Sequence, residues 1–147
     1  MAGGWHMRFT VSLPDGTVTG SDGHLQIQPT ADNRWIILRP DATGAFVPFS
    51  EITNYGQGQL ESIRLDAATT IFQERYTDCH PPDASGRFKY VSMLDQALPD
   101  GNHMHTTRTG WGSADYHYSV DVMEGDTNPA LYALRTRTGE RESPPLP

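Results

Sequence analysis

The sequence has one cysteine, few basic residues and no long apolar run, and each shortage excludes a class of protein. Cys79 is the single cysteine in 147 residues, so no internal disulfide can form and packing must stabilise the fold. No stretch is apolar over the roughly 18 residues that a transmembrane helix needs. The N-terminal sequence MAGGWHMRF also lacks the apolar run of a signal peptide, so neither secretion nor membrane insertion is expected.

Positive charge is scarce as well. Eleven Lys and Arg residues stand against 18 Asp and Glu residues, which gives a net charge of −7 and a pI near 5.2. The one basic cluster, Arg135, Arg137 and Arg141, is interrupted by Glu140 and Glu142. Nucleic acids and anionic membranes need a clustered positive patch, so neither is expected as the main partner. The composition suits a reducing compartment, either the cytoplasm or the inside of a virion.

Short alternating segments between turn residues predict an all-β fold. Residues 7–13 place Met7, Phe9, Val11 and Leu13 on one face, and residues 87–94 alternate in the same way. Turn sequences such as PDG, DG and DN separate these segments. About eight to ten short strands joined in this way predict an antiparallel β-sandwich or a small β-barrel with little helix.

The same pattern predicts which side chains fill the interior and where the domain ends. Trp35–Leu38 is an unbroken apolar run typical of a strand covered on both faces, and Pro48 indicates a sheet edge or a bulge. Residues 1–138 are predicted to form one β-rich domain, and the Pro-rich residues 139–147 a tail. The expected core consists of Phe9, Val11, Leu25, Ile27, Trp35, Ile37, Phe88, Tyr90, Tyr118 and Val120.

The pair His103-x-His105 is the strongest chemical signal. On a strand these two imidazoles point to the same face, where they can bind Zn²⁺ or another divalent transition metal. His117, on the following strand of a hairpin, is the candidate third ligand. The length of the turn decides whether it joins them, because a shift of one residue reverses every side chain. An even-length turn places His117 on the opposite face, and an odd-length turn makes all three histidines converge. No other cofactor is expected.

Aromatic residues provide candidate binding surfaces. Trp111, between Gly110 and Gly112, is predicted to lie at a turn, where its ring either stacks on a ligand or caps the core. Tyr116 and Tyr118 belong to the same stretch. Trp5, near the N-terminus, and Leu146, in the tail, are the candidate contacts with other subunits.

Three functions are compatible with these features. The first is a non-catalytic structural or binding module, a subunit of a larger assembly such as a virion or tail component and typically a homo-oligomer. The second is a small barrel enzyme or ligand-binding barrel that uses His103 and His105, with or without a metal. The third is a carbohydrate-binding sandwich that uses Trp111, Tyr116 and Tyr55. The sequence leaves open whether the protein is an enzyme, and a small molecule or glycan remains a candidate ligand.

Overall fold

The described part of the chain is built from strands alone. The computed structural model describes residues 2–65, 71–98, 100–126 and 132–143, and none of these residues is helical. The strands are β1 (Gly3–Ser12), β2 (Val18–Ala31), β3 (Arg34–Pro40), β4 (Phe46–Gly56), β5 (Gln59–Arg64), β6 (Ile71–His80), β7 (Phe88–Ala97), β8 (His103–Gly112), β9 (Tyr116–Gly125) and β10 (Ala133–Ser143). The predicted all-β class is therefore confirmed.

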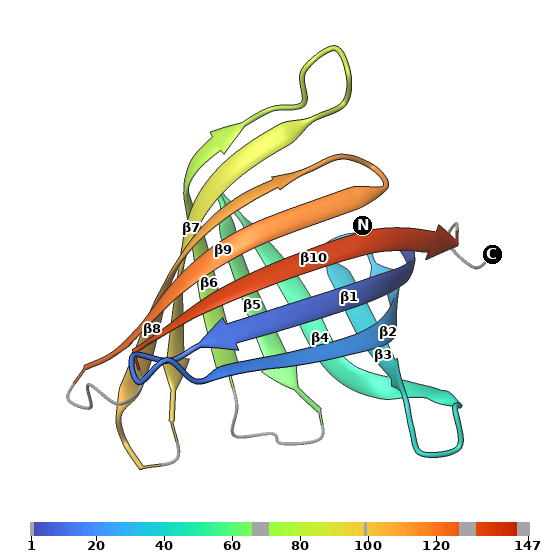
Figure 1. The fold of residues 1–147 in the computed structure, drawn as a ribbon. Coiled ribbons are helices and arrows are strands. Elements are labelled where there is room, and N and C mark those ends of the chain that lie inside the picture. Colours follow the sequence, from blue (N-terminus) through green and yellow to red (C-terminus); the bar gives the residue numbers. More distant parts are fainter. Residues whose placement is uncertain (1, 66–70, 99, 127–131, 144–147) are drawn as a thin grey trace.

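The strands close into one barrel (Figure 1). Each strand pairs antiparallel with the next along the chain, and β1 pairs with β10 to complete the ring. Of the two predicted architectures, the barrel is correct and the sandwich is not. An eight-stranded barrel is just wide enough for side chains to fill it, so a ring of ten strands leaves a wider interior.

One type of turn recurs in the barrel. In the turn after β1, the Leu13 amide donates to the Thr17 carbonyl, and Gly16 has a φ of 87°. The turns after β3, β6 and β7 repeat this arrangement, with Gly44, Gly86 and Gly101 in the left-handed conformation. The sequence LPDG therefore occurs at two of these turns because the turn requires such residues.

Two local predictions have different outcomes. Pro48 lies at a β-bulge between β3 and β4, as predicted, and a closed ring gives it no edge to occupy. The predicted tail begins too early, because β10 continues through Ser143 and Arg141 pairs with Trp5. Residues 139–143 therefore belong to the barrel wall, where pairing with β1 outweighs their polar composition. The rest of the tail, 144–147, lies outside the described residues.

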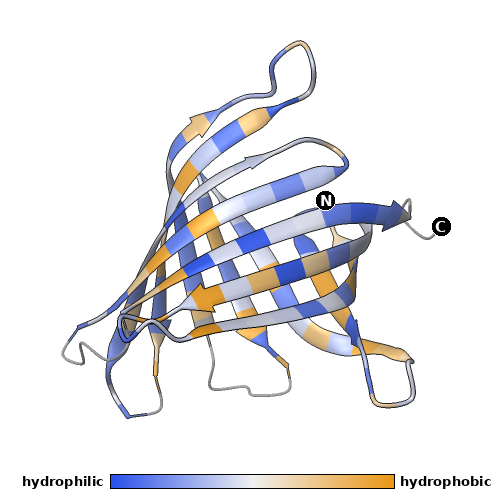
Figure 2. Ribbon diagram, in the orientation of Figure 1, coloured by the Kyte–Doolittle hydropathy of each residue, from blue (hydrophilic) through white to orange (hydrophobic). Residues whose placement is uncertain are grey.

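The interior is polar along β7, β8 and β9. Ser92, Ser119 and Asp121 are completely buried, and Arg108 is nearly so. Since side chains alternate along a strand, the neighbours of these residues point outward. Figure 2 shows the resulting alternation of hydrophilic and hydrophobic residues along β9, β10 and β1. On β9 the polar residues are the ones that face inward.

This inversion corrects part of the predicted core. Leu25 and Tyr90 are buried inside the barrel as expected. Tyr118 and Val120 point outward, because they alternate with the buried Ser119 and Asp121. The prediction that Trp35–Leu38 is covered on both faces is also wrong, since a single-layered wall leaves all four residues half-buried. The inward apolar residues line the interior from the side of β1, β2 and β3.

The accessible surface is large for a chain of this mass. It measures 8945 Å², whereas a compact protein of 16.3 kDa is expected to expose about 7,500 Å². Extended hairpins contribute to the excess (Figure 1). Many inward residues, Phe9 and Arg137 among them, also keep part of their surface accessible. The interior is therefore not filled to the density of a solid core.

Candidate functional site

A network of buried ion pairs crosses the barrel interior. The Nε and Nη2 atoms of Arg108 donate to the two carboxylate oxygens of Asp121 at 2.9 and 3.1 Å. Arg135 donates to the same carboxylate at 2.6 and 2.9 Å. Arg108 also reaches Glu74 at 3.1 Å, and Ser92 donates to Glu74 at 2.5 Å. Five residues from β6 to β10 are thereby bonded into one unit.

The network fixes the charges of its members. Burial opposes ionisation of Asp121, but its hydrogen bond with Arg108 and the neighbouring positive charges lower its pKa to about 2. Burial likewise opposes the charge on Arg108, yet Asp121 and Glu74 hold the pKa of its guanidinium above the ordinary value. Both groups therefore stay ionised at neutral pH. Removal of either partner would leave a buried charge without compensation.

Next to the network, Tyr90 and His117 form a hydrogen-bonded pair. The Tyr90 hydroxyl lies 2.7 Å from Nε2 of His117, and the two rings stack at 5.9 Å. Gly110 makes this position possible, because a Cβ atom there would lie 2.4 Å from the Tyr90 ring. The Tyr90 ring therefore occupies the space that a side chain on β8 would need. This is the structural reason for glycine at position 110.

Both members of the pair are neutral at physiological pH. Burial, followed by the charges of Arg137 and Arg108, lowers the pKa of His117 to about 3. Burial raises the pKa of Tyr90, and it also raises that of Tyr76, whose ring packs against Tyr90 at 5.2 Å. With both groups neutral, the pair is held by a hydrogen bond between the Tyr90 hydroxyl and Nε2 of His117. A histidine with so low a pKa is a poor base at pH 7, so the pair is better suited to binding than to proton transfer.

Arg137 is the exception in this otherwise paired interior. It points inward between Arg135 and Gly139, its Nε atom has no hydrogen-bond partner, and no ion pair found among the described residues includes it. The buried Oγ atom of Ser119, its partner across β9 and β10, also lacks a hydrogen bond. Burial and then the charge of Arg108 lower the pKa of Arg137 to about 10, so it stays protonated at pH 7. The Nε–H group of Arg137 and the hydroxyl of Ser119 thus both lack a hydrogen-bond acceptor among the described residues.

A cavity of about 270 Å³ lies against the neighbouring wall. Its inward lining includes Met7, Phe9 and Leu25, with Arg39 at one side. Phe9 is the direct cross-strand partner of Arg137 on β1. Arg137 does not itself line the cavity, but it lies on the strand next to one of the cavity's apolar walls. Apolar walls with a few polar or charged groups nearby are the usual make-up of a small-molecule site.

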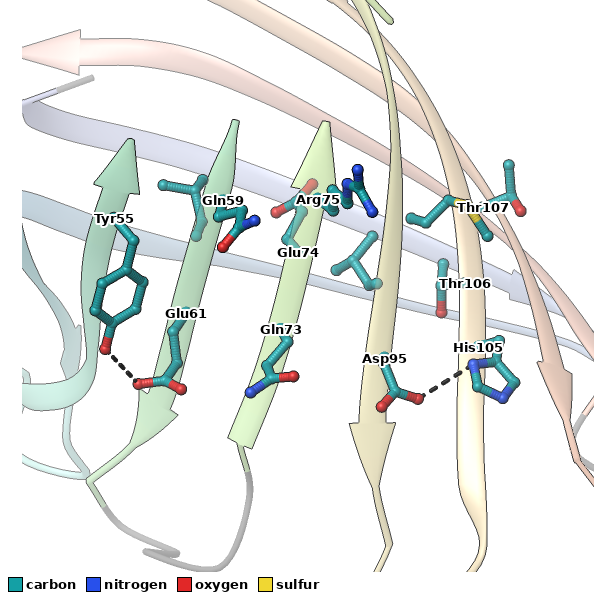
Figure 3. A pocket seen from close by; sticks show the side chains of 13 residues that line it. Tyr55, Gln59, Glu61, Gln73, Glu74, Arg75, Asp95, His105, Thr106 and Thr107 are labelled. Carbon is teal, nitrogen blue, oxygen red and sulfur yellow. Dashed lines mark hydrogen bonds and ion pairs between the residues drawn. The ribbon is translucent and has the colours of Figure 1, made fainter. Parts of the chain in front are cut away.

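A second hollow lies on the outside of the barrel, across β4 to β8 (Figure 3). Its volume is about 440 Å³, and outward polar side chains line it. These groups form polar contacts with one another: the Tyr55 hydroxyl donates a hydrogen bond to Glu61 at 3.1 Å, and Nδ1 of His105 lies 3.1 Å from the Asp95 carboxylate. Unlike the interior, this groove contains no buried group that lacks a partner within the described part of the chain.

The predicted convergence of three histidines is wrong. Gly112 pairs with His117 and Trp111 with Tyr118, so the turn has the even parity that separates His117 from the other two. His103 and His105 lie on the outer face, where both contact Asp95 and His105 also contacts Asp126. His117 faces inward. Across residues 2–65, 71–98, 100–126 and 132–143, no group of three or more potential ligands is placed to hold a metal ion.

The predicted binding residues come together on the outer face. Trp111 lies within β8 rather than at a turn, with its ring 5.4 Å from that of Tyr118. Trp111 is 39% exposed, and Tyr116, at the start of β9, is exposed as well. Trp5 is not available as a subunit contact, because it is 6% exposed inside the barrel with Arg141 over its ring. Leu146 lies outside the described residues.

The interior residues that matter most were not singled out from the sequence. Arg135 and Arg137 were assigned to the one basic cluster near the C-terminus, and Asp121 was given no role. One signal was present: Arg135-x-Arg137 and Ser119-x-Asp121 each alternate with uncharged residues, which places each polar pair on one face of a strand. The alternation along each strand does not show which of its two faces lies inside the barrel.

Comparisons with known proteins provide no match from which a function of this site could be inferred. Among the described residues there is no helix long and apolar enough to cross a membrane. No protein-family model, no curated protein and no solved structure matches the chain.

Proposed function

We propose that the protein is a ligand-binding barrel that holds a small organic anion in its interior beside Arg137. The observation that carries this proposal is the buried guanidinium of Arg137, for which the described part of the chain provides no counter-ion. An unpaired buried charge costs several kcal/mol, and that cost is offset when a ligand supplies the missing negative charge. The free hydroxyl of Ser119 offers a second donor on the adjacent strand.

The surroundings of Arg137 suit an organic ligand rather than a bare ion. Met7, Phe9 and Leu25 provide apolar contacts beside the anionic group. The cavity volume of about 270 Å³ is just below the range of about 300–1,000 Å³ for ligand sites, so only a small molecule fits. The low basicity of His117 favours binding over catalysis.

The test compares two matched arginine variants. Binding of 2-naphthoate is measured by titration calorimetry to the wild type, to Arg137→Met and to Arg75→Met, which removes an exposed arginine from the outer groove. The proposal predicts loss of binding only in Arg137→Met. It also predicts that Arg137→Met is at least as stable as the wild type, because an unpaired buried charge has been removed.

Two results would contradict the proposal. One is unchanged naphthoate affinity in Arg137→Met. The other is naphthoate binding that is lost in Arg75→Met, which would place the binding site in the outer groove. A fall in the stability of Arg137→Met by several kcal/mol would show that its guanidinium already has a partner.

A second function, contact with other subunits, is supported by the outer face of β8, β9 and β10. Between the strand ends, where Glu124 and Glu140 lie, its outward residues are uncharged, and Trp111, Tyr116 and Leu134 expose large apolar side chains there. We propose that this face packs against another copy of the chain, with the tail at 144–147 as a further contact. Light scattering on Trp111→Ser should then show a smaller mass than the wild type, and an unchanged mass would reject the contact.

A further inference from the structure

A line of polar side chains crosses the floor of the outer groove. Glu61 on β5 pairs with Gln73 on β6, and Gln73 pairs in turn with Asp95 on β7. Asp95 pairs with His105 on β8. Directly paired residues of antiparallel strands share a face, so these four side chains form one row, called here the polar row, with a member on each strand. Figure 3 shows it in line with Tyr55, which lies beyond Glu61 on β4.

A second row runs beside the first, two residues further along each strand. It consists of Gln59, Arg75, Met93 and Thr107, which are paired in that order and are all exposed. Together the two rows offer carboxylate, amide, guanidinium, imidazole and hydroxyl groups. Hydrogen-bond donors and acceptors are therefore mixed over the whole floor of the groove.

The two carboxylates of the polar row are held in place by their neighbours. The Tyr55 hydroxyl donates a hydrogen bond to Glu61 at 3.1 Å. Nδ1 of His103 and Nδ1 of His105 each lie 3.1 Å from the Asp95 carboxylate. A carboxylate has about four acceptor sites, so these contacts orient both groups and leave capacity for a ligand.

The charge and the pairing of the groove narrow the class of ligand. Glu61 and Asp95 are negative and face only one arginine, Arg75, among the lining residues, so the groove has no positive patch that would hold an anionic polymer. β5, β6 and β7 each pair on both sides. In this described part of the wall a peptide strand therefore finds no free backbone edge to which it could add.

The groove also provides apolar surface beside its polar groups. The ring of Tyr55 and the side chain of Met93 are both exposed there. A flat aromatic ring next to hydrogen-bonding groups suits a ligand that has an apolar face and a polar edge. Sugar rings have this character, because their C–H groups lie on the faces and their hydroxyls on the rim.

We propose that the outer groove binds an extended, neutral oligosaccharide that lies across β5 to β8 with one ring against Tyr55. Neighbouring strands are about 4.8 Å apart, which is close to the length of one pyranose unit in an extended chain. Successive sugar units therefore meet successive members of the polar row. The volume of about 440 Å³ lies within the usual range for ligand sites. This site is separate from the barrel interior and does not depend on the anion proposed there.

Titration calorimetry with cellotetraose, xylotetraose and chitotetraose tests the proposal. At least one of these neutral chains should bind at least about tenfold more tightly than its monosaccharide, since each further unit adds hydrogen bonds. Tetragalacturonate carries a carboxylate on every unit. It should bind at least about tenfold more weakly than the best neutral chain, because Glu61 and Asp95 repel it.

Matched variants locate the site. Gln73→Ala removes the centre of the polar row, and Tyr55→Ala removes the aromatic surface. Each should weaken binding of the best tetraose at least about tenfold. Gln28→Ala is the control: it removes an outward glutamine from β2, since Gln28 alternates with the inward Leu25 and Ile27, and it should leave the affinity unchanged.

The outcomes are distinct from those of the interior site. Failure of all three tetraoses to bind at millimolar concentration would overturn the proposal, as would equal losses in Gln73→Ala and Gln28→Ala. Tighter binding of tetragalacturonate than of the neutral chains would overturn the assignment to a neutral ligand. Binding of 2-naphthoate should be the same in Gln73→Ala as in the wild type. Gln73 and Tyr55 are both exposed, so if one variant does not fold, the other still decides the question.

Discussion

The buried His117 should make the protein less stable as the pH falls from 7 to 5. In the folded state its pKa is lowered to about 3, against 6.5 for a free histidine. The unfolded chain therefore binds a proton at pH values where the folded chain does not, and stability is lost as the pH drops below 6.5. This loss continues until the pH reaches the folded-state pKa.

The size of the effect follows from these two values. Integration of the proton uptake between pH 7 and pH 5 gives a loss of about 2 kcal/mol. Below about pH 4.5 ordinary carboxylates begin to titrate, whereas the lowered pKa of Asp121 keeps it ionised there, so the interval from 7 to 5 isolates the histidines. His24 acts in the opposite sense: Glu142 raises its pKa, so its contribution grows as the pH falls.

Urea denaturation followed by tryptophan fluorescence at the two pH values measures this loss. His117→Gln keeps an acceptor for the Tyr90 hydroxyl but cannot take up a proton, so its stability should change by about 2 kcal/mol less than that of the wild type. His24→Gln, on the outer surface, is the control and should lose at least as much stability as the wild type, because the opposing contribution of His24 is removed. An equal fall in the wild type and His117→Gln would show that His117 is protonated without cost in the folded barrel.

Three further predictions concern the interior. Asp121→Asn should destabilise the protein by about 3 kcal/mol or more in urea denaturation, because Arg108 and Arg135 lose a carboxylate partner; a loss below about 1 kcal/mol would mean that the network contributes little. Gly110→Ala should lower stability by about 1–3 kcal/mol, since its Cβ would overlap the Tyr90 ring, whereas Gly23→Ala, with nothing within 4 Å, should cost much less; equal effects would rule out this packing. Tyr90→Phe should cost about 1–3 kcal/mol by leaving His117 without its hydrogen bond, and an unchanged melting temperature would argue that the bond is not formed.

Removal of Arg137 separates stability from function. Most buried charges in this barrel are paired, and their loss destabilises the fold. Within the described residues no ion pair is found for Arg137, so its replacement by Met should leave the fold at least as stable while abolishing ligand binding. A residue that destabilises the free protein, and whose destabilising effect is offset only when a ligand is bound, is expected at a binding site.

The sequence by itself determined the secondary structure. Alternation with a period of two requires a strand wherever residues such as Phe9 and Val11 recur. Glycine at Gly16, Gly44, Gly86 and Gly101 marks the turns, because other residues are strained at positive φ. These are local constraints that act within a few residues of each other. They were sufficient to predict an all-β fold of about eight to ten strands.

Only the tertiary structure decided which face of each strand lies inside. The alternation on β9 separates Tyr118 and Val120 from Ser119 and Asp121, but it does not say which pair is buried. Burial of Asp121 is tolerable only because Arg108 and Arg135, 13 and 14 residues away, supply its hydrogen bonds. The missing partner of Arg137 is likewise a property of the closed ring, since it depends on which charges the other strands direct into the same enclosed space.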